Sequence, residues 1–234
     1  MRYKSIENKL YVNNRKKYIK HVEENSVSIF VSNDPMPTNA DETLPFIQNT
    51  NLLYLTGIDQ EDTYLILAPN FPDERMREIL FIKKTSEEIS IWEGNKLSKD
   101  EARKISGIQN IMWNDEFNKI IPLITAESNN AYLDKNEHIR SSTKVETAQD
   151  RFLKNFKSKN NSINIQRSYP ILSSLRMIKD KVEIDLISHA CKITEKGFRR
   201  VLKFIKPGVN EYDIEAELIH EFIINKSKGF AYQP

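Results

Sequence analysis

The four histidines of the chain are its first candidates for metal ligands, and they lie far apart in the sequence. Two histidines that bind one metal ion from a single helix face need a spacing of three or four residues, and no two of these have it. His220 and Glu221 begin as a zinc-binding helix would, but Ile224 stands where the second histidine belongs. We therefore expect each histidine to be a surface or hydrogen-bonded residue: His21, His138, His189 and His220.

The acidic residues and the single cysteine also do not indicate a metal site or a catalytic site. Glu211 and Glu215 are four residues apart on one helix face, so with Glu217 and Glu221 they could be read as metal ligands. Basic partners, water and the helix dipole explain them without a metal ion. Cys191 lies in a helical pattern and is expected to be a small buried side chain. Because no phosphate loop, nucleophile elbow or supported Cys–His pair is present, the residues alone indicate no assembled active site.

The composition of the chain excludes several classes of partner. Its 234 residues include 35 basic and 33 acidic side chains, which give a net charge of +2. Nucleic-acid binding needs a basic face, so no nucleic-acid partner is expected. No apolar run approaches the ~20 residues of a membrane-spanning helix, and the N-terminus lacks the apolar core of a signal peptide. One cysteine fits a reducing compartment. We therefore predict a soluble, cytoplasmic protein without a membrane partner.

The pattern of elements predicts an α/β fold with a mixed sheet. Within residues 46–58, a polar turn at 48–51 leads into a short apolar run that stops at Gly57, and this run and residues 63–68 are expected to form a hairpin joined by residues 57–60. Ser98 and Glu101 have the spacing of a capping box at the start of a helix. Further strands are expected at 26–31, 78–82, 88–94, 108–113, 131–133 and 163–165, and helices at 5–24, 98–106, 116–125 (interrupted by Pro122) and 144–157.

Paired helices replace strands after about residue 170. A short helix over 171–177 precedes a long one from Lys181, which ends at the breaker pair Pro207–Gly208. Asn210 is expected to cap a further helix. This change of pattern places a domain boundary between residues 168 and 178. Apolar residues recur along the long helix at helical spacing and predict a core stripe: Ile187, Ala190, Cys191, Phe198, Val201 and Ile205.

A resemblance to a known family begins with the segment from Gln48 to Ile58, Gln-Asn-Thr-Asn-Leu-Leu-Tyr-Leu-Thr-Gly-Ile. It resembles the N-terminal domain signature of the Xaa-Pro aminopeptidases (aminopeptidase P), in the creatinase and prolidase superfamily. Three later segments resemble parts of that family in the same order. They are the Arg-x-x-Lys-x-x-x-Glu-Ile pattern from Arg176 to Ile184, the Pro-Gly-x-x-Glu turn at 207–211, and a Gly-x-x-x-Tyr pattern at 229–232 whose tyrosine comes one residue early.

This resemblance implies a creatinase-like, mixed-sheet N-terminal domain over residues 1–170 and the incomplete start of a pita-bread α+β catalytic domain over 171–234. The family removes an N-terminal residue that precedes proline, with two divalent ions, usually manganese, that share a bridging water. Two Asp, one His and two Glu hold these ions in the family, all after the strand that Gly229 approaches. The resemblance therefore implies no catalytic and no metal-binding residue here, an inactive segment of an active parent, and apolar helix stripes after Lys181 that a later sheet would cover.

Two residues match family positions with a role in substrate binding. Trp92 lies in a segment similar to one whose tryptophan, in tetrameric relatives, reaches the substrate pocket of a neighbouring subunit; packing on its own sheet is the alternative. Tyr232 matches a pocket tyrosine beside the metal site, or is a core tyrosine of a strand. The implied partners are peptides with proline in second position and further copies of the chain in a homo-oligomer. A non-catalytic, peptidase-like binding or assembly module, such as a histone chaperone domain, is the alternative function.

Overall fold

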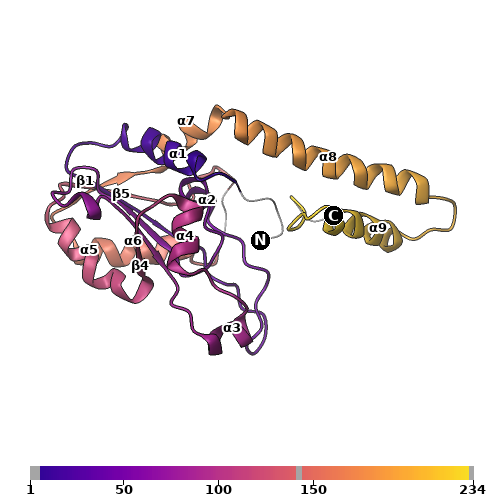
Figure 1. Ribbon diagram of the computed structural model, residues 1–234, viewed down its shortest axis with the longest axis horizontal. Coiled ribbons are helices and arrows are strands. Elements are labelled where there is room, and N and C mark those ends of the chain that lie inside the picture. Colours follow the sequence, from indigo (N-terminus) through magenta and orange to yellow (C-terminus); the bar gives the residue numbers. More distant parts are fainter. Residues whose placement is uncertain (1–5, 141–143, 232–234) are drawn as a thin grey trace. The chain divides into compact units, whose positions relative to one another are not determined.

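The computed structural model describes residues 6–140 and 144–231. Contacts within the chain divide it into two compact units, residues 6–177 and the residues from Ile178 onward. The sheet of the first unit contains β1 (Ser26–Val31), β2 (Tyr64–Leu67), β3 (Glu78–Ile82), β4 (Asn110–Trp113), β5 (Asn130–Leu133) and β6 (Asn164–Arg167) (Figure 1). Its helices are α1 (Lys9–Ile19), α2 (Thr50–Thr56), α3 (Glu87–Glu93), α4 (Lys99–Ser106), α5 (Phe117–Ala126), α6 (Ala148–Lys159) and α7 (Tyr169–Met177).

The six strands form one mixed sheet in the order β4-β3-β2-β1-β5-β6. β2 lies antiparallel to both of its neighbours, with Ile66 opposite Ile29 of β1 and Ile79 of β3. The outer pairs β3–β4, β1–β5 and β5–β6 are parallel. The mixed-sheet α/β class expected from the sequence is confirmed.

Helices cover both faces of this sheet. Successive side chains of a strand point to opposite faces, so Leu65 and Leu67 of β2 enter one core and Ile66 enters the other. The first core contains Tyr18 of α1, side chains of α2, and Leu172 of α7. The second contains Phe117 of α5 and aromatic residues of α6. α7 begins at Tyr169 and extends into the stretch 171–234, and it packs with the first unit.

The hairpin expected over 46–68 is wrong in its first half, because residues 50–56 form the helix α2. The side chain of Asn49 accepts hydrogen bonds from the backbone N–H groups of Asn51 and Leu52, both at 2.9 Å, and so caps the helix. Gly57 ends it in the left-handed region at φ +71°. Capping residues at both ends therefore outweigh the short apolar run, and β2 pairs with β1 and β3 instead.

Two further expectations are corrected. Residues 87–93 form the helix α3 rather than a strand, because Ser86 caps it and Glu87 and Glu88 stand in its first turn, where the helix dipole favours them. α5 also continues through Pro122 without interruption. Proline removes the hydrogen bond to the carbonyl four residues earlier, and that residue, Asn118, is exposed.

Most of the other elements lie where the sequence places them. The strands 26–31 and 78–82 have their predicted bounds, and the capping box of Ser98 and Glu101 starts α4. The strands expected near 108–113, 131–133 and 163–165 and the helices near 5–24, 116–125, 144–157 and 171–177 are present within a few residues.

The second unit contains α8 (Lys181–Phe204) and α9 (Glu211–Ile224), with a capping box at Asn210 as expected. They pack closely at Gly197, where an added Cβ would lie 2.8 Å from Phe222. The expectation of burial for Cys191 is wrong, since this residue is exposed. The predicted stripe on α8 is likewise largely exposed at Ile187, Phe198 and Ile205. Helical spacing identifies an apolar face, and it does not say which segment covers it.

Candidate functional site

The signature segment is organised by the side-chain amides that enter and cap α2. Gln48 is buried; its Nε2 donates to the carbonyls of Ile58 (3.1 Å) and Gln60 (2.7 Å), and its Oε1 accepts from the N–H of Asn49. These bonds fix the chain on both sides of α2, because Ile58 and Gln60 follow the helix and Gln48 precedes it. The polar residues of the signature therefore hold a short helix in place.

One buried carboxylate receives the remaining donors of the signature. Asp134 follows β5 directly and is 5% exposed. Its two oxygens accept from Asn49 Nδ2 at 3.1 Å and from Asn51 Nδ2 at 2.8 Å. Burial raises the pKa of the Asp134 carboxyl, and the hydrogen bonds from Asn51 and Asn49 oppose this shift. Asp134 thus connects the start of α2 to the end of β5, which pairs in parallel with β1.

Arg176 joins a second family segment to the same place. Its Nη1 donates to Asn51 Oδ1 at 2.7 Å and to Thr50 Oγ1 at 3.2 Å. Its guanidinium also lies 5.7 Å from the ring centre of Tyr54. Two segments that resemble the family, about 120 residues apart, therefore meet through the Asn51–Arg176 hydrogen bond. We call Asn49, Asn51, Asp134 and Arg176 the motif junction.

The motif junction has the properties of a structural site. Asp134 has donors on both of its oxygens, and the orientation of the Asn51 amide is fixed by a carboxylate on one side and a guanidinium on the other. No nucleophile or general base with an open approach belongs to it. Asn49, Asn51 and Arg176 belong to the segments that carry the resemblance, whereas Asp134 was not predicted from the sequence. The position of Asp134 directly after the predicted strand 131–133 was the available signal.

Trp92 lies on α3 and is 85% exposed. Its neighbour Ile91 is 77% exposed, and none of the residues of α3 is buried. The indole therefore does not pack on its own sheet, which removes the alternative considered for it. An exposed Trp next to an exposed Ile is an apolar contact surface of the kind that binding partners cover.

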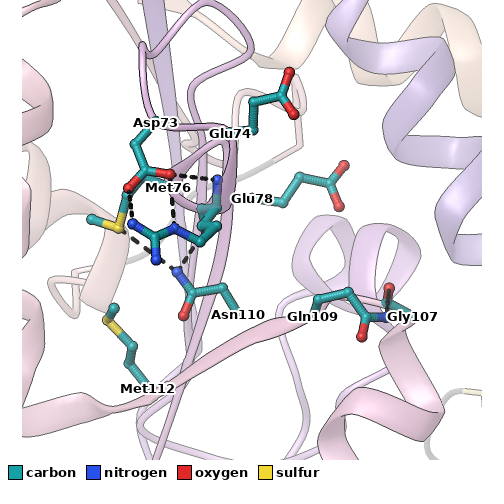
Figure 2. A pocket seen from close by; sticks show the side chains of 9 residues that line it. Asp73, Glu74, Met76, Glu78, Gly107, Gln109, Asn110 and Met112 are labelled. Atoms are coloured by element: carbon teal, nitrogen blue, oxygen red, sulfur yellow. Dashed lines mark hydrogen bonds and ion pairs between the residues drawn. The ribbon is translucent and has the colours of Figure 1, made fainter.

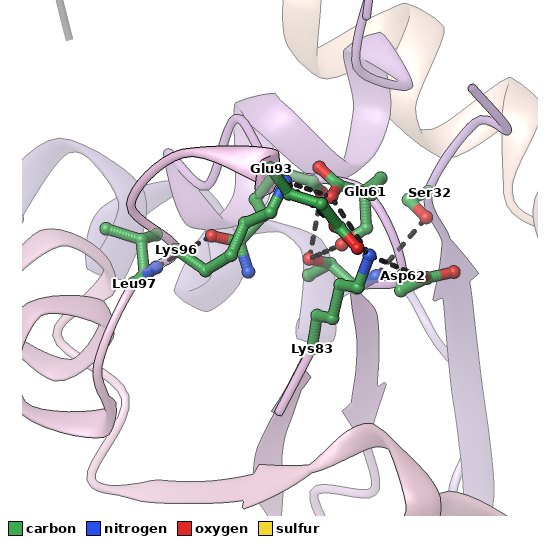
Figure 3. A network of polar contacts seen from close by, with 9 residues as sticks. Ser32, Glu61, Asp62, Lys83, Glu93, Lys96 and Leu97 are labelled. Atoms are coloured by element: carbon green, nitrogen blue, oxygen red, sulfur yellow. Dashed lines mark hydrogen bonds and ion pairs between the residues drawn. The ribbon is translucent and has the colours of Figure 1, made fainter. Parts of the chain in front are cut away.

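A cluster of charged residues surrounds the base of the loop that contains α3 (Figure 3). Lys83 lies 2.7 Å from Glu93 and 3.5 Å from Glu61, while Lys96 lies 2.5 Å from Glu61 and 3.7 Å from Glu93. Burial alone would raise the pKa of Glu61, but the Lys96 hydrogen bond, a backbone hydrogen bond and both lysine charges lower it overall. We call Glu61, Lys83, Glu93 and Lys96 the charged cluster. It was not found from the sequence, because its members come from three separate segments.

An open pocket of about 680 Å³ lies beside β3 and β4 (Figure 2). Its acidic groups already have basic partners: Asp73 pairs with Arg75 at 2.7 Å, Glu74 with Arg77 at 3.0 Å, and Glu78 with Arg15. Trp92 is not among the residues that line it. The pocket therefore offers no unpaired charge on which to base a reaction.

The residues that the structure describes do not fit a pair of catalytic metal ions. Within residues 6–140 and 144–231, no three His, Cys, Asp or Glu side chains gather in a way that could hold a metal ion. All four histidines are exposed, as expected: His21, His138, His189 and His220. Glu217 and Glu221 both accept from Arg200, so basic partners account for them. Tyr232, the second expected substrate-binding residue, lies outside the described residues.

A family model identifies the fold. The model of the aminopeptidase P N-terminal domain matches residues 11–132, more than half of the chain. The chain belongs to the aminopeptidase P family. A second model, that of metallopeptidase family M24, matches residues 185–234. One model thus matches residues of the first unit and the other matches residues of the second. The resemblance carried by the signature is confirmed.

Individual relatives of aminopeptidase P agree with this assignment. The chain is 26% identical over 208 residues to the Xaa-Pro aminopeptidase of Haemophilus influenzae, covering 89% of this chain and 46% of the relative. A Bacillus anthracis structure assigned to aminopeptidase P has a TM-score of 0.87 at 28% identity, covering 97% of this chain and 54% of the other. The aminopeptidase PepP of Pseudomonas aeruginosa shares the fold, with a TM-score of 0.83 at 22% identity, covering 97% and 51%. The chain therefore spans about half the length of the curated relatives it matches.

Among the helices of the described residues, none is long and apolar enough to cross a membrane.

Proposed function

We propose that this chain forms the N-terminal part of a metal-dependent Xaa-Pro aminopeptidase, which releases the N-terminal residue that precedes proline. The similarity to the Xaa-Pro aminopeptidase of Haemophilus influenzae over 89% of the chain is the observation that carries this proposal. The match to metallopeptidase family M24 at residues 185–234 supports a metal-dependent reaction. The implied peptide substrates have proline in second position, and the enzyme acts in the cytoplasm.

The proposed division of labour is that this segment supports a catalytic centre and does not contain one. Residues 1–170 would be the N-terminal domain and 171–234 the start of the catalytic domain. Two divalent ions, proposed to be manganese, would be held by residues of the longer enzyme, since the described residues contain no group of ligands that fits them. No step of the reaction is therefore assigned to a residue of this chain.

Trp92 and Tyr232 are the proposed substrate-binding residues of the chain. The 85% exposure of Trp92 leaves its indole face open to a peptide or to a second subunit. An aromatic face of this kind can stack on a prolyl ring. In a homo-oligomer, such a side chain would contact the substrate of a neighbouring subunit. Tyr232 is proposed by its match to the family position alone.

In the longer enzyme that carries this chain, Trp92→Ala is expected to raise KM for an Xaa-Pro peptide about tenfold, because a stacked aromatic contact is lost. The value of kcat should change little if the contact is made equally in the bound substrate and the transition state. Steady-state hydrolysis with manganese present measures both constants. Trp92→Phe keeps an aromatic face and should restore most of the affinity. An unchanged KM in Trp92→Ala would contradict the proposed role.

A further inference from the structure

α3 has little hydrophobic anchoring of its own. No residue of this helix is buried, and of its three apolar residues Ile89 is half-buried while Ile91 and Trp92 are exposed. Ser86 and Ser90 make hydrogen bonds only within the helix and its cap. In the described part of the chain, Glu93 is the one residue of α3 whose side chain forms an ion pair or hydrogen bond with a neighbouring segment. Among the polar side chains of the helix, Glu93 is therefore the one that fixes its position against a neighbouring segment.

Glu93 connects the two ends of the loop that contains α3. Lys83 directly follows β3 on one side, and Lys96 precedes α4 on the other. Both lysines also contact Glu61, so one inner carboxylate and one outer carboxylate join both ends of the loop. Figure 3 shows this arrangement, with Glu93 placed above Lys83 and Lys96. Linking the ends in this way removes conformational freedom from the residues between them.

The burial of the inner members makes this anchor firm. The side chains of Glu61 and Lys96 are each 13% exposed, whereas that of Glu93 is 45% exposed. Sheltered charges interact more strongly than exposed ones, so the Glu61–Lys96 pair provides a fixed base. Glu93 joins it from the solvent side, where its ion pairs contribute little to global stability. Its removal should therefore free α3, while Glu61 still links Lys83 and Lys96 and the fold stays intact.

A second contact connects the same loop to the signature segment. The N–H of Leu97 donates to Gln60 Oε1 at 2.8 Å, and the carbonyl of Gln60 accepts from Gln48 Nε2 at 2.7 Å. Gln60 is buried, and the Leu97 bond fixes the orientation of its amide. The loop end after α3 is thus attached to the residues that hold α2.

We propose that Glu93 is a positioning residue for Trp92: through Lys83 and Lys96 it fixes α3 so that the neighbouring indole is held ready to contact a peptide. The inference rests on the proposed function, because the role of Trp92 in peptide binding belongs to that proposal. It adds to it by assigning the charged cluster as the device that orders the contact residue. Glu93 itself touches no substrate in this scheme.

The first test measures the mobility of Trp92 in this chain and does not depend on catalysis. In a Trp113→Phe background, Trp92 is the remaining tryptophan of the two. Glu93→Gln should remove most of the slow component of its fluorescence anisotropy decay, since α3 then moves on the nanosecond timescale. Glu88→Gln, on the same helix and with the same loss of charge, should leave the decay unchanged. An unchanged decay in Glu93→Gln, or an equal loss in Glu88→Gln, overturns the proposal.

The second test measures peptide hydrolysis by the longer enzyme. Glu93→Gln should raise KM by roughly threefold to tenfold without changing kcat or the unfolding midpoint, and it should add nothing further to Trp92→Ala. If Trp92→Ala raises KM but Glu93→Gln does not, the positioning role is wrong while the proposed function stands. If Trp92→Ala itself leaves KM unchanged, the proposed role of Trp92 fails, and the inference that rests on it fails as well.

Discussion

Arg15→Met is expected to lower the free energy of unfolding of the first unit by about 3–5 kcal/mol, because two buried carbonyls lose their donor at about 1–3 kcal/mol each. Arg15 lies in α1 and is fully buried, and its Nη1 donates to the carbonyls of Leu55 (2.8 Å) and Ser106 (3.0 Å). These residues lie at the C-terminal ends of α2 and α4, where unpaired carbonyls concentrate negative charge. Its Nε donates to Glu78 of β3 at 3.1 Å.

The cost arises mainly at the two carbonyls. Burial lowers the pKa of the Arg15 guanidinium, and Glu78 opposes that shift. Once Arg15 is removed, Glu78 regains water because its side chain is partly exposed, but the carbonyls of Leu55 and Ser106 lose their donor. One side chain thus joins α1, two helix ends and the sheet.

Urea unfolding followed by circular dichroism measures this loss. The matched control is Lys16→Met, which removes a basic side chain from the adjacent, exposed position of α1 and should leave the unfolding midpoint unchanged. A loss below about 1 kcal/mol for Arg15→Met would show that Leu55 and Ser106 find other donors, and it would contradict the role given to Arg15.

Gly57→Ala is expected to destabilise the first unit by about 2–4 kcal/mol, from backbone strain and overpacking together. Gly57 ends α2 at φ +71°, where a side chain is unfavourable. An added Cβ would also lie 2.3 Å from Cε2 and 2.4 Å from Cζ of the Tyr11 ring. Tyr11 is buried in α1 and cannot move away freely. The glycine of the signature is thus required for helix termination and for the close approach of α1.

A double-mutant cycle separates these two causes. Tyr11→Ala removes the ring that the new methyl group would meet, so Gly57→Ala should cost less in that background than in the native chain. The remaining cost should be about 1–2 kcal/mol, the strain of the left-handed conformation. Equal costs in the two backgrounds would contradict the steric explanation. Urea unfolding at one protein concentration is again the measurement.

The parts of the fold that sequence reasoning predicted correctly are those set by local patterns. The strand 26–31 alternates and then becomes apolar, and Ser98 with Glu101 caps α4 through contacts three residues apart. The errors at 50–56 and 87–93 also have a local cause. Each of these helices has only seven residues, too few to show a helical period, so that an apolar run looks like a strand.

The candidate site was less accessible to such reasoning, because its contacts join distant residues. Asp134 accepts hydrogen bonds from residues 85 and 83 positions away, and Arg15 reaches Ser106 across 91 positions. The local sequence around Asp134 and Arg15 gives no indication of these distant partners. Trp92 was selected through the resemblance, and its exposure and the charged cluster beneath it are findings of the structure.

The family signature has gained a physical explanation. Asn49 caps α2, Asn51 bridges Asp134 and Arg176, and Gly57 ends the helix against Tyr11. These residues build the α2 side of the domain and the attachment of α7. The polar residues and the glycine of the signature therefore have structural roles in the first unit.

The most direct test of this account is peptidase activity of the purified 234-residue chain. The chain is first shown to be folded by circular dichroism and cooperative unfolding, and it is then incubated with an Xaa-Pro peptide and manganese. We predict no hydrolysis above the rate in buffer, because the metal centre is proposed to lie in other residues of the longer enzyme. Hydrolysis that requires manganese and stops on addition of a chelator would contradict the account.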